Sequence, residues 1–164
     1  MRDDDLRRSL KEDMRKLLPD IVDAYTDMAI GEPEIPTMLH IVTSDQTNVA
    51  MGMSEFQDEE SKVAYMETAA KLLADGGHIP IIVYLCAEAW RATGLTQPPS
   101  QSADRREVIV VFGQSAPGDT LTAQMPIIRN GDEILPGAIE YLEGMASPLV
   151  ATFWETYFNT HKGI

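Results

Sequence analysis

The chain has 164 residues, of which 44% are hydrophobic and 24% are charged, and its formal net charge is −13. This length and composition predict one soluble globular domain over residues 1–164, with a core large enough to fold without a metal or a disulfide. The only cysteine excludes an internal disulfide and argues against a cysteine-based metal site. The charged first residues are unlike a signal peptide, and no stretch reaches the ~18 apolar residues of a membrane helix, so we expect a cytoplasmic protein without membrane contact.

The acidic residues are concentrated in one part of the sequence. No Lys or Arg occurs between Lys16 and Lys62, whereas ten acidic residues do. These ten are Asp20, Asp23, Asp27, Glu32, Glu34, Asp45, Glu55, Asp58, Glu59 and Glu60. A surface of this sign repels phosphate backbones, so we expect no direct nucleic-acid binding. Two interpretations stay open: a solvated face that keeps the protein soluble, or a docking surface for a basic partner.

Hydrophobic periodicity and turn residues predict three helices separated by strands. In chain order these elements are a helix over 3–30, strands over 37–43 and 48–54, a helix over 58–74, strands over 79–90, 106–116 and 121–129, a short strand over 132–135 and a helix from Ser147-Pro148 onward. Residues 137–146 give no clear prediction. The order indicates an α+β domain with an antiparallel sheet of about five strands and helices packed on one or both faces. It resembles the order in roadblock and profilin-like domains, which are scaffolds and dimerisation modules.

Local residues indicate where these elements end or become irregular. Pro19 removes one hydrogen bond and crowds the preceding turn, so we expect the first helix to break or kink there. Ser54 is the expected cap of the second helix. Pro126 indicates an edge position or a bulge, because proline cannot donate to a ladder. Asn130-Gly131 is the strongest hairpin signal, because both central residues of a type I′ turn have positive φ.

The segment 79–90 allows two interpretations. As a strand it is largely apolar on both faces, as expected for a strand covered on both sides, and Glu88 shares a face with Cys86 and Trp90. Alternatively, a helix begins near Leu85, because AEAWRA is a good helical string that Gly94 would end. The strand is the interpretation that we favour.

This region also resembles a known group of sequences. The segments CAEAW, PPSQSADRREVIVVFG and MPIIRNGDE, which lie within residues 78–134, are similar to a loosely defined group of uncharacterised bacterial and phage-encoded proteins. Members of the group share an EAW-ended strand, a PPS-type loop, a strand entered through R-x-E and a following hairpin. The resemblance supports the strand–loop–strand interpretation and implies no activity.

Glu88 is the carboxylate with the clearest claim to chemistry. On an apolar face its pKa would be raised by desolvation, as a general acid requires. A ligand pocket would then add Trp90 for stacking and Arg105 or Arg106 for holding an anion. In the structural interpretation, Glu88 pairs with Arg91, Arg105 or Arg106 and fixes the loop to the sheet.

The remaining reactive residue types give no catalytic signature. Cys86 has no base that the sequence assigns to it, so we interpret it as a small buried hydrophobe. The histidines, His40, His78 and His161, are isolated in the sequence, so we expect no metal. Phosphate-binding glycine loops and the common hydrolase motifs are absent. We therefore expect no cofactor.

Two function classes follow. The first is a non-catalytic interaction or regulatory protein whose acidic surface binds a basic partner. Its interaction residues would be Asp20, Asp23, Asp27, Glu55, Asp58, Glu59 and Glu60. The second is a small enzyme or ligand-binding domain with a pocket near Glu88, Trp90 and Arg106. We favour the first class and expect a homo-oligomer, formed through the first helix or through those aromatic residues of the last helix that exceed what the core needs.

Overall fold

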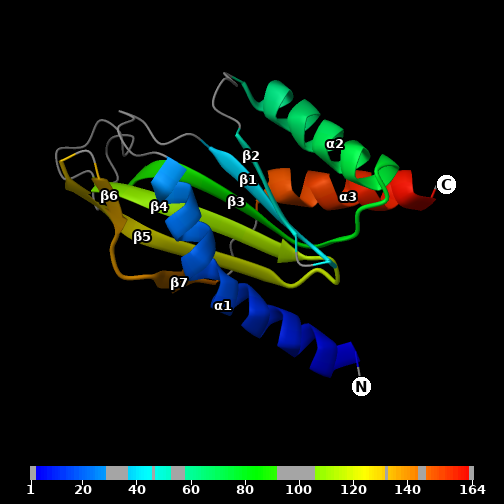
Figure 1. Cartoon of the computed structure of the whole chain (residues 1–164), viewed down its shortest axis with the longest axis horizontal. Coiled ribbons are helices and arrows are strands. Elements are labelled where there is room, and N and C mark those ends of the chain that lie inside the picture. Colours follow the sequence, from blue (N-terminus) through cyan, green and yellow to red (C-terminus); the bar gives the residue numbers. More distant parts are fainter. Residues whose placement is uncertain are drawn as a thin grey trace.

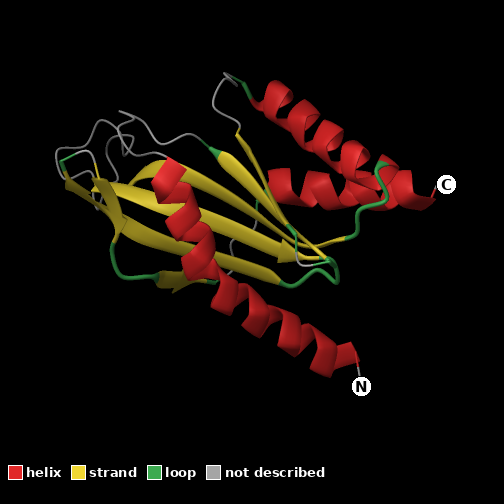
Figure 2. Cartoon of the chain, in the orientation of Figure 1, coloured by secondary structure: helices red, strands yellow, loops and turns green. Residues whose placement is uncertain are grey.

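The computed structural model describes residues 3–28, 37–45, 47–52, 58–91, 106–131, 133–143 and 147–162. The predicted α+β class and element order are confirmed (Figure 2). The elements are α1 (Asp3–Met28), β1 (Met38–Thr43), β2 (Asn48–Gly52), α2 (Glu59–Asp75), β3 (Pro80–Arg91), β4 (Arg106–Ser115), β5 (Thr120–Asn130), β6 (Glu133–Pro136), β7 (Glu140–Leu142) and α3 (Pro148–Lys162). The sheet has more strands than the five expected, partly because β7 lies in the region without a prediction.

The seven strands form one antiparallel sheet between two layers of helix. The strand order is β2-β1-β3-β4-β5-β6, and β7 pairs with β5. Helix α1 covers one face of this sheet, whereas α2 and α3 cover the other (Figure 1). The hydrophobic core is therefore divided into two layers by the sheet, and β3 contributes side chains to both.

Strand β3 settles the ambiguity over residues 79–90. Its backbone pairs with β1 on one side and with β4 on the other, and the pairing with β4 runs from Ile82 to Arg91. The helix that the sequence allowed from Leu85 is therefore wrong. Two hydrogen-bonded neighbours and helices on both faces override the helical propensity of this string, because propensity is a weak local term.

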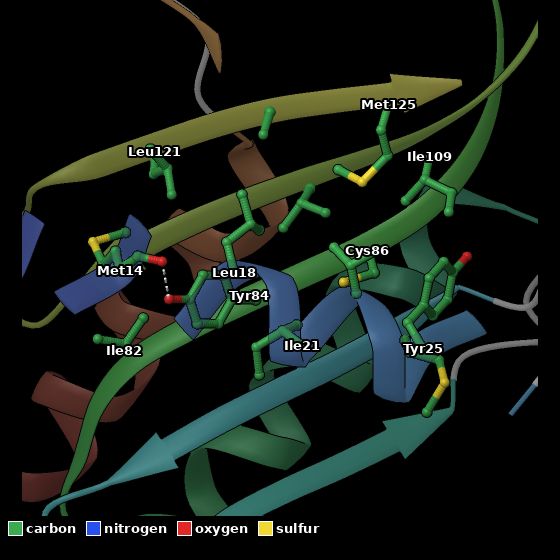
Figure 3. Close-up of a cluster of buried hydrophobic side chains, with 14 of the residues drawn as sticks. Met14, Leu18, Ile21, Tyr25, Ile82, Tyr84, Cys86, Ile109, Leu121 and Met125 are labelled. Carbon is green, nitrogen blue, oxygen red and sulfur yellow. Dashed lines mark hydrogen bonds between the residues drawn. The ribbon is translucent and has the colours of Figure 1, made fainter. Parts of the chain in front are cut away.

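The layer under α1 is held by apolar packing and one buried hydrogen bond. Met14, Leu18 and Tyr25 of α1 point toward Tyr84 and Cys86 of β3 (Figure 3). The Tyr84 hydroxyl donates to the Met14 carbonyl oxygen over 2.8 Å, and both residues are fully buried. This bond links the centre of the sheet to the middle of the helix.

The second layer contains the aromatic residues of α3. Phe153, Trp154 and Tyr157 are buried, and Trp154 Nε1 donates to the Gln114 carbonyl oxygen over 3.1 Å. Phe158 is 38% exposed and stacks on Trp154. The aromatic face of α3 is thus almost wholly core, and only Phe158 exceeds what the core covers.

Helix α1 is continuous through Pro19, so of the two predicted outcomes, a break or a kink, the break is not found. Proline costs the helix one hydrogen bond, and burial of Met14 and Leu18 before it and Ile21 after it holds both halves on the sheet. The helix nevertheless changes direction about halfway along its length (Figure 1), as expected for a helix with an internal proline.

The turn residues act nearly where the sequence places them. Gly118 has a φ of +106°, as the predicted turn between β4 and β5 requires. The β5–β6 hairpin is confirmed, but Asn130 pairs with Glu133, so the turn is centred one residue later, with Gly131 at a φ of +64°. The irregularity predicted at Pro126 is present, because the register of β5 shifts by one residue between Gln124↔Glu140 and Ile127↔Pro136. Pro126 lies in β5 between the segments that pair with β7 and β6, where its missing N–H leaves no gap in a ladder.

We predict that Tyr84→Phe lowers the free energy of unfolding by about 1 kcal/mol, because it removes a buried hydrogen bond without changing the packed ring. Urea unfolding followed by circular dichroism measures the change. Tyr141→Phe, which alters a phenol exposed on β7, is the control and should leave the unfolding midpoint unchanged. Equal effects of the two substitutions would show that the bond to Met14 does not stabilise the fold.

Candidate functional site

Glu88 lies in an ion-pair cluster that joins three strands. Its side chain is 16% exposed, and its Oε1 is 3.8 Å from Nη2 of Arg129 on β5. The Nε of Arg129 donates to Oε2 of Glu107 on β4 over 2.9 Å. We call Glu88, Glu107 and Arg129 the Glu88 cluster. Arg129 bridges carboxylates from two neighbouring strands, which is the structural role that the sequence proposed for a different set of arginines.

For two other residues predicted to line the pocket, Trp90 and Arg106, the structure describes only the backbone pairing, which places them next to this cluster in the β3–β4 ladder. Trp90 is the backbone partner of Glu107, and Arg91 is the partner of Arg106, at the end of the β3–β4 ladder. Arg105 lies outside the described residues. The sequence did not indicate Arg129 as the partner of Glu88, because the two are 41 positions apart. The successive registers of β3, β4 and β5 bring them together.

Three grooves lie on the described surface. One of about 410 Å³ runs between α1 and the ends of β1 and β3, with Asp13 and Lys16 at its rim. A second, of about 320 Å³, lies between α1 and β5–β7, where the Arg15 guanidinium is 4.9 Å from the centre of the Tyr141 ring. A third, of about 330 Å³, has an apolar floor between α2 and α3. Glu88 lines none of these three grooves.

Buried titratable groups lie beneath α1, next to the Glu88 cluster. Burial raises the pKa of the Cys86 thiol to about 12. The pKa of Tyr25 is also raised, first by burial and then by the nearby Cys86 and Glu88, and its hydroxyl makes no hydrogen bond within the described part of the chain. A thiol with this pKa stays protonated at neutral pH, so Cys86 has the structural role expected of it.

His40 and His78 lie on different parts of the fold. His40 is buried on β1 opposite Tyr84, and burial lowers its pKa, so the neutral imidazole is favoured. His78 lies in the exposed turn after α2, where its carbonyl oxygen accepts a hydrogen bond from the Tyr157 hydroxyl. Across the described ranges, no three His, Cys, Asp or Glu side chains lie close enough to hold a metal ion.

The acidic block of the sequence is divided between opposite faces of the sheet. Asp20, Asp23 and Asp27 are exposed on α1, and we call them the α1 acidic stripe. The set Asp58, Glu59 and Glu60 is exposed at the start of α2, which packs on the other face. Glu55 lies outside the described residues. A partner that docks on one face therefore cannot contact both sets.

The acids of α2 have structural roles. Asp58 is the N-cap of α2, because its Oδ1 accepts a hydrogen bond from the Ser61 backbone N–H over 2.7 Å. This interaction lowers the pKa of the Asp58 carboxyl. Glu59 forms an ion pair with Lys62 over 3.3 Å, and Glu59 and Glu60 both lie where the helix macrodipole favours negative charge. Ser54, the cap that the sequence proposed, lies outside the described residues.

The α1 acidic stripe has no such explanation. None of its three carboxylates makes an ion pair or a side-chain hydrogen bond with the residues that the structure describes. The three lie at spacings of three and four residues, at which like charges repel on a helix. Asp27 is in the last turn, which has no basic residue and where the macrodipole disfavours an acid.

No described helix is long and apolar enough to cross a membrane. Comparison of the chain with models of protein families, with curated proteins and with solved structures found no match.

We predict that the Cys86 thiol of the folded protein reacts with Ellman's reagent at pH 8 about 1,000-fold more slowly than that of the urea-unfolded chain. Burial blocks access, and a pKa of about 12 leaves little thiolate. The absorbance of the released thionitrobenzoate measures both rates. Fast modification of protein that keeps its native circular dichroism would contradict the burial of this residue.

We predict that Arg129→Gln lowers the free energy of unfolding by about 1–2 kcal/mol, because it leaves two partly buried carboxylates without their shared cation. Glu88→Gln should cost less, and the double variant should show a coupling of about 0.5–2 kcal/mol in chemical unfolding. Lys71→Gln removes an exposed cation from α2 and is the matched control, with little effect expected. Additive effects of Glu88→Gln and Arg129→Gln would show that the two side chains do not stabilise one another.

Proposed function

We propose that the protein is a non-catalytic interaction protein that binds a basic partner through the α1 acidic stripe. The observation that supports this most directly is the exposure of three aspartates on one helix that form no ion pair with the described residues. Carboxylates exposed in this way are accessible to cations of another molecule.

The energetics of α1 favour a role in binding over a role in folding. Each like-charge pair at these spacings costs an isolated helix about 0.2–0.5 kcal/mol. An acid in the last turn adds about 0.3–1 kcal/mol of unfavourable interaction with the macrodipole. Folding therefore gains nothing from the α1 acidic stripe, whereas the acids at the start of α2 stabilise their helix.

The spacing of the stripe indicates the chemistry of the partner. Asp20 and Asp27 are seven residues apart, which corresponds to about 10 Å along a helix. A surface that presents two or three Lys or Arg side chains over this distance matches the stripe. The net charge of −13 would also accelerate the approach of such a partner at low salt.

The proposed docking surface contains three of the seven interaction residues that the sequence suggested. Asp58 and Glu59 already interact within α2, so their removal would perturb the helix as well as any contact. The alternative function, a small enzyme or ligand-binding domain near Glu88, Trp90 and Arg106, is less well supported. Glu88 pairs with Arg129 and lines none of the three grooves described above.

We predict that the triple variant Asp20→Asn, Asp23→Asn, Asp27→Asn binds a fluorescein-labelled octa-arginine peptide at least 10-fold more weakly than the unmodified chain. Fluorescence anisotropy at 50 mM NaCl measures this, and raising the salt to 200 mM should weaken binding to the unmodified chain steeply. The stability of the variant should be unchanged or slightly higher, because the substitutions relieve repulsion within α1.

The control variant, Glu60→Gln, Glu67→Gln, Asp75→Asn, removes the same charge from α2, on the opposite face. It should retain affinity to within about 3-fold if the α1 acidic stripe is the docking surface. Equal losses in the two variants would indicate general attraction to an acidic protein. The acidic residues would then serve solubility alone, and the proposed function would be wrong.

A further inference from the structure

The outer side of β2 carries unpaired backbone groups. Strand β2 is the first in the sheet order, and β1 is its one neighbour among the described strands. The Thr43 N–H donates to the Thr47 carbonyl oxygen over 3.0 Å, and the β1–β2 register continues from this pair without a shift. In an antiparallel ladder the bonded positions alternate, so Val49 and Met51 bond to β1. The N–H and C=O groups of Asn48, Ala50 and Gly52 therefore point away from the sheet.

This edge has none of the usual protection against pairing. Exposed edge strands are normally blunted by charges, prolines, bulges or shortness. Residues 46–54 contain no charged residue and no proline, and no bulge interrupts the β1–β2 register. At the opposite end of the sheet, β6 has four residues that begin with Glu133 and end with Pro136. The two described ends of the sheet thus differ, and of these two β2 has the features of a strand that accepts another.

We propose that β2 pairs with β2 of a second copy of this chain, in an antiparallel arrangement across a two-fold axis at Ala50. The second copy also carries a charge of −13, so two copies can approach closely only where their surfaces are uncharged. The stretch 46–54 meets that condition, whereas exposed carboxylates line α1 and the start of α2.

The geometry of β2 is complementary to itself. A two-fold axis at Ala50 places this residue opposite Ala50 of the partner subunit, and Asn48 opposite Gly52 of the partner subunit. All three outward-pointing residues then bond at once, as an isologous interface requires. Ala50 and Gly52 carry little or no side chain, and a Cβ built on Gly52 meets no described atom within 4 Å.

The interface should be weak and should strengthen with salt. A five-residue strand buries less than the roughly 1,200 Å² of a stable interface, so we expect a dissociation constant in the micromolar to millimolar range. Salt screens the repulsion between two acidic copies, so it should favour the dimer. Binding of a basic partner at the α1 acidic stripe should respond to salt in the opposite way. The dimer does not depend on the proposed function, and the two can fail separately.

Sedimentation velocity of the full chain tests the dimer, at about 10 µM to 1 mM protein and at 50, 150 and 500 mM NaCl. We expect a monomer–dimer equilibrium whose association constant rises several-fold from the lowest to the highest salt. Ala50→Lys places two like charges across the axis, and Ala50→Pro removes one outward N–H that β1 does not use. Both substitutions should weaken association at least 10-fold while the unfolding midpoint stays native.

Leu135→Lys adds the same charge to the exposed side of β6 and is the matched control, which should leave association unchanged. If Ala50→Pro impairs folding, Ala50→Lys decides alone. A chain that stays monomeric at 1 mM and 500 mM NaCl would overturn the proposal. So would a dimer that tolerates both changes at Ala50, because that dimer would use another surface. Octa-arginine binding should be unaffected by Ala50→Lys, which separates this result from that of the proposed function.

Discussion

Strand β3 is the constraint on which the other elements depend, because it is hydrogen-bonded on both sides and buried on both faces. Its Tyr84 and Cys86 form the floor beneath α1, and its Val83 and Leu85 form the floor beneath α2 and α3. A shift of one residue in its register would exchange these two sets and place each against the wrong layer. Glu88 lies near the C-terminal end of this strand, and its position follows from the same register.

The acidic residues show why charge alone does not define a functional surface. Asp58 caps a helix, and Glu88 shares a cation with Glu107, so these carboxylates are part of the fold. The α1 acidic stripe differs because its aspartates repel one another and form no ion pair with the described residues. Folding does not explain this set of acids, so the proposed function is based on it.

Much of the architecture was predictable because it depends on local patterns. The largely apolar segments 79–90 and 106–116 predicted two central strands, and the glycine turns predicted how the later strands connect. At Pro19 the sequence left a break and a kink open, and the helix stays continuous because packing of Leu18 and Ile21 on the sheet compensates for one lost hydrogen bond. The short strand β7 was missed because three residues are too few to show a period.

The candidate site was less predictable than the fold. The sequence predicted that Glu88 is a buried acid with an ion-pair partner, but it indicated Arg91, Arg105 or Arg106 as that partner. Arg129 is close to Glu88 because the pairing of β3 with β4 and the pairing of β4 with β5 together align the two residues. No local sequence pattern predicts this combination. Likewise, a run of ten acids in the sequence is not one surface, because the helices that carry them pack on opposite sides of the sheet.

The sequence by itself determined which segments are helices and strands, where most of them turn, and that the surface is acidic. These properties depend on neighbouring residues and on composition, so they can be read along the chain. Only the tertiary structure decided which strand lies at an unprotected edge, which acids are already paired and which face each acid occupies. Those properties depend on contacts between residues far apart in the chain, and it is the order and register of the strands that create them.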